Sequence, residues 1–321
     1  MALIANYYDK TLLRCSYAEY LNHNIFLDSE NLTTLGWNPS YVHVDVIMNG
    51  EYIGNYTLAE RIKIEEKRIN IKDISKDLEN GGFVCEINER ADEKYNFRTD
   101  WGESWLGKYG LSISLKDPDE VSVEVRKKVR EIVQEAEDSL FSNNFSDSEN
   151  GYAKYFDLNS LVDWYIMHEY IRMEDATVFY TSAYFYYDPN DKKNHMGPCW
   201  DYDTGAGNTT NNLQPEGFDL KMHATWYARL FEDENFVNLV KTRWNEKKLD
   251  LATTISNIQN KADEIKISAD YTFIRWDVLG KQTGLNADGW ETRTTYQSEL
   301  DFMIDWLNRR VDWLDTNLNA L

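Results

Sequence analysis

The sequence predicts an α+β fold, with an antiparallel β-rich N-terminal part and a mainly helical C-terminal part. Two β-patterned runs joined by Asn49-Gly50 lie within the first 120 residues, and an Asn-Gly link of this kind is a strong signal for a β-hairpin. Beyond residue 120, apolar residues recur at helical spacing in most segments. The 321 residues include 11 Trp, 21 Tyr and 13 Phe, which is enough apolar material for a large core.

The N-terminal part is expected to begin with a helix over 10–24, where apolar side chains recur at helical spacing. The runs 41–48 and 51–58 are rich in β-branched and aromatic residues and form the two arms of the predicted hairpin. Two further strands are expected over 81–88 and 111–115. Together these segments predict a mainly antiparallel sheet with one helix ahead of it.

The C-terminal part begins with an amphipathic stripe over 120–140, which predicts a helix with one face on the core. Asp157 is suited to cap the next helix. An aromatic run over 179–187, a turn at 188–191 and a return strand form a second predicted hairpin. The remaining helices are expected over 225–231, 236–247, 251–268 and 297–318.

These segments predict a single domain over residues 1–321, with a β-rich lobe over 1–120 and a mainly helical lobe over 121–321. The chain contains no repeat, no low-complexity tract and no Pro- or Ser-rich linker, so we expect the two lobes to share an interface. The patterned region starts directly at Met1 without a visible signal peptide. We therefore expect the chain to be a piece of a longer protein.

The net negative charge of the chain limits the classes of partner that it is expected to bind. Lys and Arg number 34 against 55 Asp and Glu, which gives a formal net charge of −21. A surface of this sign repels nucleic acid and anionic membranes, and it favours basic partners and bound cations. No apolar run approaches the length of about 18 residues that a membrane-spanning helix needs. The three cysteines have no zinc-site spacing and allow at most one disulfide.

Two carboxylates stand out in the run Gly197–Ala206, where Asp201 and Asp203 lie two residues apart at the end of a predicted strand. Small residues follow them directly. Carboxylate oxygens are the ligands that Mg²⁺ prefers, and the ion keeps its remaining positions for water and phosphate oxygens. The pair therefore indicates a divalent-cation site, and the alternative is a loop with two solvated acids.

Several specific sequence blocks are spaced along the chain. The most specific are NGEYIGNYTLAERI at Asn49–Ile62 and GPCWDYDTGAGN at Gly197–Asn208. The others are Ala5–Arg14, Gly81–Ile87, Ser114–Pro118, Trp226–Phe231 and Arg243–Glu246. In their sequence and order these blocks resemble the spore coat protein H (CotH) family of atypical kinases, and the resemblance extends over nearly the whole chain.

This resemblance implies a two-lobed kinase-like fold that binds ATP with Mg²⁺ or Mn²⁺ and phosphorylates Ser or Thr hydroxyls of proteins. Phosphoryl transfer needs cations that neutralise charge and a carboxylate near the attacking hydroxyl. Asp203 is then expected to be the main metal ligand, and Asp201 a second ligand or a structural acceptor. Asn208 would complete the metal shell or cap the next turn. Asp175 is the candidate catalytic carboxylate, because it precedes the hairpin that leads to Gly197–Asn208. We call this segment the metal loop for its expected role.

A basic side chain must meet the phosphates in so acidic a protein. Lys63 and Lys116 are the main candidates and Arg14 is a third, although each is also suited to an ordinary surface ion pair. Glu60 is the expected ion-pair partner of such a lysine, or a solvated residue at a strand end. Trp200 is placed to stack on adenine or to belong to the core.

One position departs from the family pattern. Many members carry Asn two residues before the candidate catalytic Asp, whereas this chain has Met173. An Asn there would help to hold a metal or to orient the base, so Met173 bears on whether catalysis is retained. His168, in the helix before Asp175, is expected to be a core residue rather than a base.

Two rival functions remain open at this stage. The first is a catalytically inactive kinase-like scaffold or binding module of a secreted or cell-surface, polysaccharide-associated protein. The second is carbohydrate recognition or hydrolysis, in which Trp and Tyr stack on sugars and paired carboxylates cleave the glycosidic bond. For the kinase we expect a monomer that binds ATP and an unidentified protein substrate. The family resemblance places it outside the cell or on the cell or spore surface of a bacterium.

Overall fold

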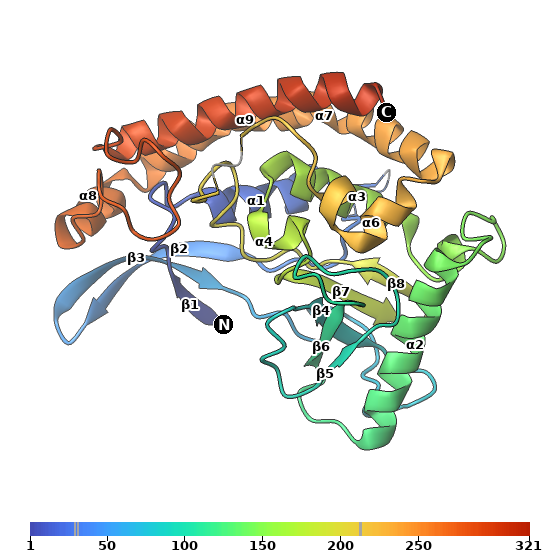
Figure 1. The fold of residues 1–321 in the computed structure, drawn as a ribbon. Coiled ribbons are helices and arrows are strands. Elements are labelled where there is room, and N and C mark those ends of the chain that lie inside the picture. The colour runs from blue at the N-terminus through green and yellow to red at the C-terminus, as the bar shows by residue number, and fades with distance from the viewer. Residues whose placement is uncertain (29, 31, 212–213) are drawn as a thin grey trace.

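The computed structural model describes residues 1–28, 30, 32–211 and 214–321 and confirms the predicted α+β fold (Figure 1). Antiparallel sheets fill the N-terminal half, and the C-terminal part is mostly helical. The strands are β1 (Ala2–Ala5), β2 (Tyr41–Met48), β3 (Glu51–Ala59), β4 (Phe83–Ile87), β5 (Asn96–Arg98), β6 (Ser112–Asp117), β7 (Ala183–Asp188) and β8 (Lys193–Met196). The helices are α1 (Arg14–Asn24), α2 (Val123–Phe141), η1 (Tyr152–Lys154), α3 (Leu158–Ile171), α4 (Glu174–Thr177), α5 (Leu220–His223), α6 (Thr225–Leu230), α7 (Glu234–Glu264), α8 (Lys266–Arg275) and α9 (Tyr296–Asn319).

The first sheet has the strand order β1-β3-β2 and contains the predicted hairpin. Asn49 and Gly50 both have positive φ, at 54° and 82°, as a two-residue hairpin turn of this sequence requires. The short strand β1 was not predicted, and it pairs with β3 from Ala2↔Ala59 to Ala5↔Tyr56. Helix α8 packs against β3, where Thr272 Oγ1 accepts a hydrogen bond from the Asn55 amide at 2.7 Å. The first sheet is thereby tied to the C-terminal helices.

The second sheet has the order β5-β6-β4-β7-β8 and is antiparallel throughout. The predicted second hairpin forms its β7 and β8 strands, and β7 pairs with β4 from Phe83↔Tyr187 to Ile87↔Ala183. This sheet therefore joins strands from both sides of residue 120. The division into lobes at that residue stays a prediction.

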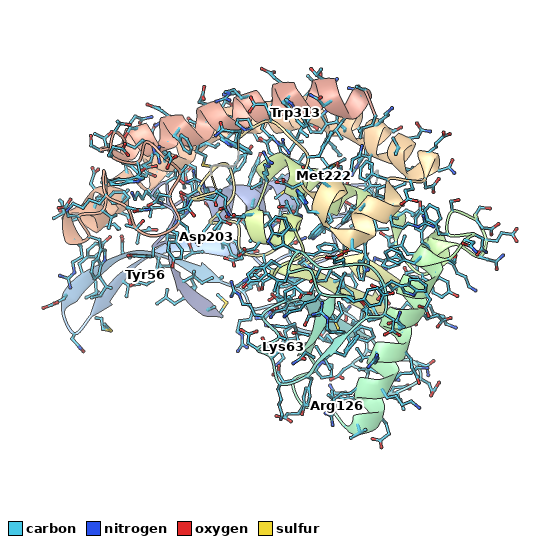
Figure 2. All side chains as sticks on the ribbon, viewed as in Figure 1. Tyr56, Lys63, Arg126, Asp203, Met222 and Trp313 are labelled. Carbon is cyan, nitrogen blue, oxygen red and sulfur yellow. The ribbon has the colours of Figure 1, made fainter. Side chains whose placement is uncertain are left out.

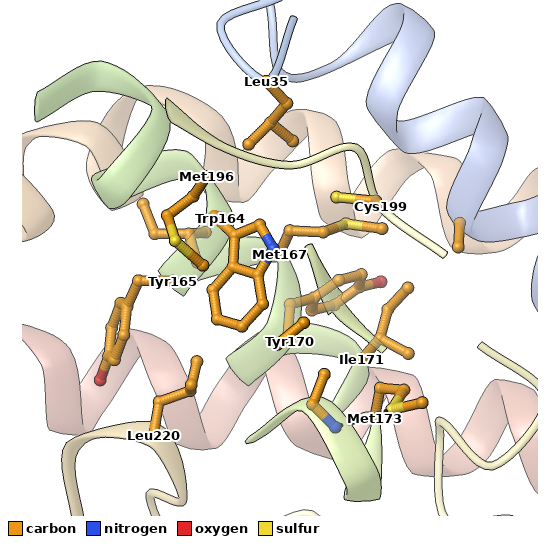
Figure 3. Packing of buried hydrophobic residues seen from close by; sticks show 14 of the residues in the cluster. Leu35, Trp164, Tyr165, Met167, Tyr170, Ile171, Met173, Met196, Cys199 and Leu220 are labelled. Atoms are coloured by element: carbon orange, nitrogen blue, oxygen red, sulfur yellow. Dashed lines mark hydrogen bonds between the residues drawn. The ribbon is translucent and has the colours of Figure 1, made fainter. Parts of the chain in front are cut away.

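The helical layer packs around α3, in which every residue from Ser160 to Ile171 is buried. Figure 3 shows this core from close by, with Trp164, Met167 and Tyr170 from α3 beside Cys199 of the metal loop. Asp157 caps α3 as predicted, because its carboxylate accepts the Ser160 amide at 2.7 Å. Helices α7 and α9 lie side by side along the outer face (Figure 1). Residues 234–264 form one helix, where two were predicted.

A buried ionic network fixes the end of α3. Glu169 and Arg310 are both fully buried, and their closest charged atoms lie 2.9 Å apart. Glu169 also accepts the Asp219 and Leu220 amides at 3.0 and 2.8 Å. Arg310, on α9, donates to the Pro215 carbonyl at 2.6 Å. The network therefore joins α3, α9 and the segment before α5.

We expect Arg310→Met to lower the free energy of unfolding by about 3–5 kcal/mol, because it leaves the Glu169 carboxylate buried without its cation. The matched control is Arg309→Met. Arg309 is 49% exposed and pairs with Glu216 at the surface, so its loss should cost about 1 kcal/mol or less. Denaturant unfolding followed by circular dichroism measures both. Equal losses in the two variants would contradict the role given to the network.

Candidate active site

The loop that carries Asp201 and Asp203 begins after β8 ends at Met196. We expected the two acids at a strand end, but residues 197–203 form no strand, and Asp201 has a φ of 67°. Asp201 accepts a hydrogen bond from the Ser182 hydroxyl at 3.2 Å. Within the described chain, no hydrogen bond reaches the Asp203 carboxylate. Figure 2 shows Asp203 between the first sheet and the helical layer.

The carboxyl groups of Asp175, Asp201 and Asp203 lie close enough to disfavour one another's ionisation. Burial, followed by the charges of Asp201, Asp9 and Asp175, raises the pKa of Asp203 to about 7. Burial also raises the pKa of Asp201, although the bond from Ser182 opposes this. Asp201 and Asp203 both line one small cavity and offer carboxylate oxygens that suit a hard divalent cation, and Asp175 lies close enough for its charge to act on Asp203. The residues present therefore fit the metal that the resemblance implies.

Asp175 lies in the short helix α4, at the edge of this cluster. Its side chain is 29% exposed, and its carboxylate is 3.9 Å from the guanidinium of Arg90. Burial and the neighbouring charge of Glu174 raise the pKa of Asp175 to about 6, against the opposing effect of Arg90. A carboxylate with a pKa near neutrality that remains open to solvent is suited to accept a proton.

Two buried side chains hold the backbone of the metal loop. Arg14 is 1% exposed, and it donates to the Gly205 carbonyl at 2.8 Å and to Asp9 at 2.6 Å. In this structure Arg14 therefore holds the backbone of the loop, and its buried guanidinium is not open to a phosphate. Asn208 donates from its amide to the carbonyls of Asp203 and Tyr8, at 2.8 and 3.0 Å. These bonds turn its nitrogen to the backbone, and a place for Asn208 in a metal shell stays a prediction.

Lys116 is held by a chain of contacts that leads to the metal loop. Its ammonium lies 3.1 Å from the carboxylate of Glu86 on β4, and it also pairs with Glu93. Glu86 in turn accepts the backbone amide of Ser182 at 2.8 Å, and the Ser182 hydroxyl donates to Asp201. The network therefore links β6, β4 and the metal loop.

Glu60 does not pair with Lys63 or Lys116 in the described structure. Its carboxylate lies 3.9 Å from Arg68 and accepts the Ser40 amide at 3.1 Å. Sequence reasoning had offered Glu60 as the partner of a phosphate-binding lysine. In the structure it is Glu86, and not Glu60, that pairs with Lys116.

Two cavities adjoin at Trp200, which lines both of them. The smaller has a volume of about 30 Å³ and is lined by Asp201 and Asp203, which leaves space for an ion or a water molecule. The larger has a volume of about 500 Å³, within the range of small-molecule sites. Its lining includes Trp200, Tyr184, the cations Arg61, Lys63, Arg68 and Lys116, and the acids Glu93, Asp117 and Asp119.

The departure at Met173 has a structural explanation. Met173 is 1% exposed within the core, and its sulfur accepts the Ala176 amide at 3.1 Å, so it caps α4 (Figure 3). The side chain at this position supports the helix that carries Asp175. His168 is fully buried, as expected. Its two ring nitrogens are hydrogen-bonded to the Trp164 carbonyl and the Tyr202 hydroxyl, and burial lowers its pKa to about 3.

Sequence reasoning missed Glu86, Arg90, Ser182 and Asp9. Only Glu86 carried a usable signal, because it is an acid inside the otherwise apolar strand 83–87. A buried acid in such a strand needs a cationic or hydrogen-bonding partner. Arg90 and Ser182 reach the site through tertiary contacts that no local pattern marks.

A family model described as CotH kinase protein matches residues 1–314 of the chain. A search of curated proteins finds no match. The match includes all the residues of the site described above.

We expect Asp203→Asn to raise the melting temperature at about pH 8 when no divalent cation is present. The pKa of folded Asp203, at about 7, lies above the ordinary value of 3.8, so its ionised form is disfavoured in the folded protein. This destabilisation is absent below about pH 4 and complete above about pH 7. The variant should gain at least about 1 kcal/mol at the higher pH, after allowance for solvent screening.

Differential scanning fluorimetry from acid to alkaline pH, with and without Mg²⁺ or Mn²⁺, measures this gain. The stability difference between the two proteins should shrink as the pH falls. Divalent cations should stabilise the native protein more than the variant. A variant that is less stable than the native protein at alkaline pH without cation would contradict the mutual repulsion.

Proposed function

The chain belongs to the CotH kinase protein family, and from this premise we propose that it is an ATP-dependent protein kinase. It would transfer the γ-phosphoryl group of ATP to a Ser or Thr hydroxyl of a protein substrate, with Mg²⁺ or Mn²⁺. The observation that carries the proposal is the presence of Asp201 and Asp203 in a small cavity that adjoins a larger one at Trp200. The larger cavity is lined by four basic, three acidic and two aromatic side chains, and Asp175 lies close enough to Asp203 to help raise its pKa. If Asp201 and Asp203 were ordinary surface acids, their carboxylates would be exposed to solvent instead.

Asp203 and Asp201 are the residues that would hold the cation. Asp203 has no hydrogen bond from the described chain, so its oxygens remain available, whereas Asp201 is oriented by Ser182. When bound, the cation would neutralise charge that develops on the transferring phosphoryl group. Arg14 holds the carbonyls that follow Asp203, which fixes the direction of the loop.

The cavity of about 500 Å³ is the proposed place for the nucleotide. Lys116 is the better candidate for the phosphates, because Glu86 holds its ammonium on the side of the cavity that leads to Asp201. Lys63 lines the same cavity and is exposed. Trp200 lines both cavities, its ring lies 6.0 Å from that of Tyr41 in an edge-on arrangement, and it would stack on the base.

Asp175 is the proposed proton acceptor. A carboxylate oxygen of Asp175 would take the proton of the substrate hydroxyl as the hydroxyl oxygen attacks the γ-phosphorus. The bond from the γ-phosphorus to the bridging oxygen would break, and ADP would leave. Arg90, at 3.9 Å, would keep the side chain directed to the site. The Arg90 guanidinium also lies over the Tyr180 ring, 5.5 Å from its centre, so it is itself supported. Asp175 therefore needs no further residue to position it.

The proposed place of action is the surface of a bacterial cell or spore, or the space outside. The family is named for a spore coat protein, and the acidic, aromatic-rich composition suits a protein exposed to solvent. Among the helices of the described chain, none has the length and apolar character to cross a bilayer.

Asp175→Asn should reduce kcat by about 10²- to 10⁴-fold, because the amide cannot accept the proton, while the Kd for ATP changes little. Transfer of ³²P from γ-labelled ATP to the chain itself or to casein measures the rate, and calorimetry measures Kd. The control is Asp277→Asn, since that side chain is 80% exposed on the surface. Glu174→Gln should move the acidic limb of the pH–rate profile to lower pH, because it removes the negative charge that helps to raise the pKa of Asp175. An unchanged rate in Asp175→Asn would refute the assignment.

Asp203→Ala separates the kinase from an inactive scaffold. If the native protein transfers phosphate and the variant does not, the metal role is supported. If the native protein binds nucleotide without any transfer, a scaffold is favoured. Equal transfer by both proteins would show that Asp203 is no essential ligand.

Lys116→Met should raise the Kd for ATP by about tenfold or more, because a charge-assisted contact to phosphate is lost. Lys63→Met is the matched control in the same cavity, and about twofold is expected there. Lys116→Arg should recover part of the affinity. Melting temperatures check that Glu86, left without its cation, does not unfold the protein. A larger effect at Lys63 than at Lys116 would reverse the assignment.

A further inference from the structure

We propose that a groove between α2 and the edge strand β5 docks an extended acidic peptide segment of a protein partner. The groove has a volume of about 580 Å³. Phe97, Leu115 and Val129 supply apolar side chains to its lining, and Tyr95 adds an aromatic ring. None of this lining belongs to the metal loop or to α4, so the proposal stands independently of the kinase activity.

The charge of the groove is opposite to that of the chain. Arg126, Lys127 and Arg130 lie on one face of α2 at helical spacing, and Lys94 joins them from the strand side. The lining contains no carboxylate among the described residues, although the chain as a whole carries a formal charge of −21. Figure 2 shows Arg126 at the lower edge of the molecule. A groove of this kind selects an anionic occupant.

The acids that pair with these cations lie at exposed positions outside the lining. Glu120, which pairs with Lys94 at 2.8 Å, is 78% exposed. Asp100 lies 3.6 Å from Arg130 and is 64% exposed. Exposed pairs of this type contribute at most about 1 kcal/mol. Carboxylates of a partner can therefore replace them at little cost.

The backbone of β5 favours an extended occupant. This strand ends the order of its sheet, so one of its edges is unpaired within the described sheet. Tyr95 accepts the amide of Leu115 on β6, and Thr99 donates to the carbonyl of Leu111 just before β6. The alternation of an antiparallel pair then directs the amides and carbonyls of Asn96 and Arg98 to the free edge. A peptide strand can add there by main-chain hydrogen bonds, with alternate side chains facing the groove. The occupant is therefore a strand with alternating acidic and apolar residues.

The groove adjoins the larger cavity through neighbouring residues. Glu93 and Lys116 line the cavity, whereas the adjacent residues Lys94 and Leu115 line the groove. A docked peptide would thus run beside the cavity without entering it. One segment of the partner could therefore bind in the groove while another segment of the same partner stays free to reach the candidate active site.

The test uses a fluorescein-labelled peptide of about eight residues, with alternating Glu and Val, which would span the edge at about 3.4 Å per residue. Fluorescence anisotropy at about 0.1 M salt measures binding to the full chain. The double variant Arg126→Glu/Arg130→Glu should raise Kd by about tenfold or more. Lys108→Glu/Lys192→Glu is the matched control, with the same change of net charge at exposed residues outside the groove, and it should bind as the native protein does.

Three results would overturn the proposal. The first is equal weakening in both double variants, which would mean that only the net charge matters. The second is equally tight binding of a peptide of alternating Lys and Val, or of single-stranded DNA of matched charge. The third is unchanged binding after N-methylation of alternate peptide nitrogens, which blocks pairing with β5. If Arg126→Glu/Arg130→Glu fails to fold by circular dichroism, Lys94→Ala/Lys127→Ala takes its place, with the same weakening expected.

Discussion

The burial of three neighbouring carboxyl groups, those of Asp175, Asp201 and Asp203, is the constraint on which the candidate site depends. Burial and the neighbouring negative charges raise the pKa values of all three carboxyl groups, so bringing them together destabilises the folded chain at neutral pH. The packing of a large aromatic core must offset this cost. A folded protein retains such a site when the charges serve chemistry, because an apolar replacement would be more stable. On the proposed function, a bound cation would offset this cost.

Three buried arginines hold irregular segments of the chain in place. Arg14, at the start of α1, is bonded to carbonyls of the metal loop. Arg172, at the end of α3, pairs with Asp219 at 2.5 Å, and Arg310 of α9 pairs with Glu169. Each guanidinium satisfies backbone carbonyls as well as a carboxylate, so it fixes an irregular segment that has no strand or helix of its own. Arg14 thereby anchors the loop that carries Asp203, and Arg172 and Arg310 anchor the segment before α5.

Local signals in the sequence predicted most of the longer elements and singled out the acids, but they did not predict the partners of the site residues. Asn49-Gly50 and Asp157 were predictable because a turn and a cap are decided by a few neighbouring residues. Asp201 and Asp203 were predictable because their spacing is itself the signal. The partner of Lys116 was not, because Glu86 reaches it only through the pairing of β4 with β6. The strands β1 and β5 are so short that pairing, rather than composition, makes them strands.

Charge also constrains how a nucleotide would enter. Without a cation, the carboxylates of Asp201 and Asp203 would face the phosphates, and two like charges about 4 Å apart repel by about 4 kcal/mol at an effective dielectric constant of about 20. Lys116 cannot relieve this alone, since Glu86 and Glu93 already offset its charge. A cation that arrives first, or together with the nucleotide, reverses the sign of the field at the metal loop. On the proposed function, cation and nucleotide binding must therefore be coupled, each strengthening the other by the same factor.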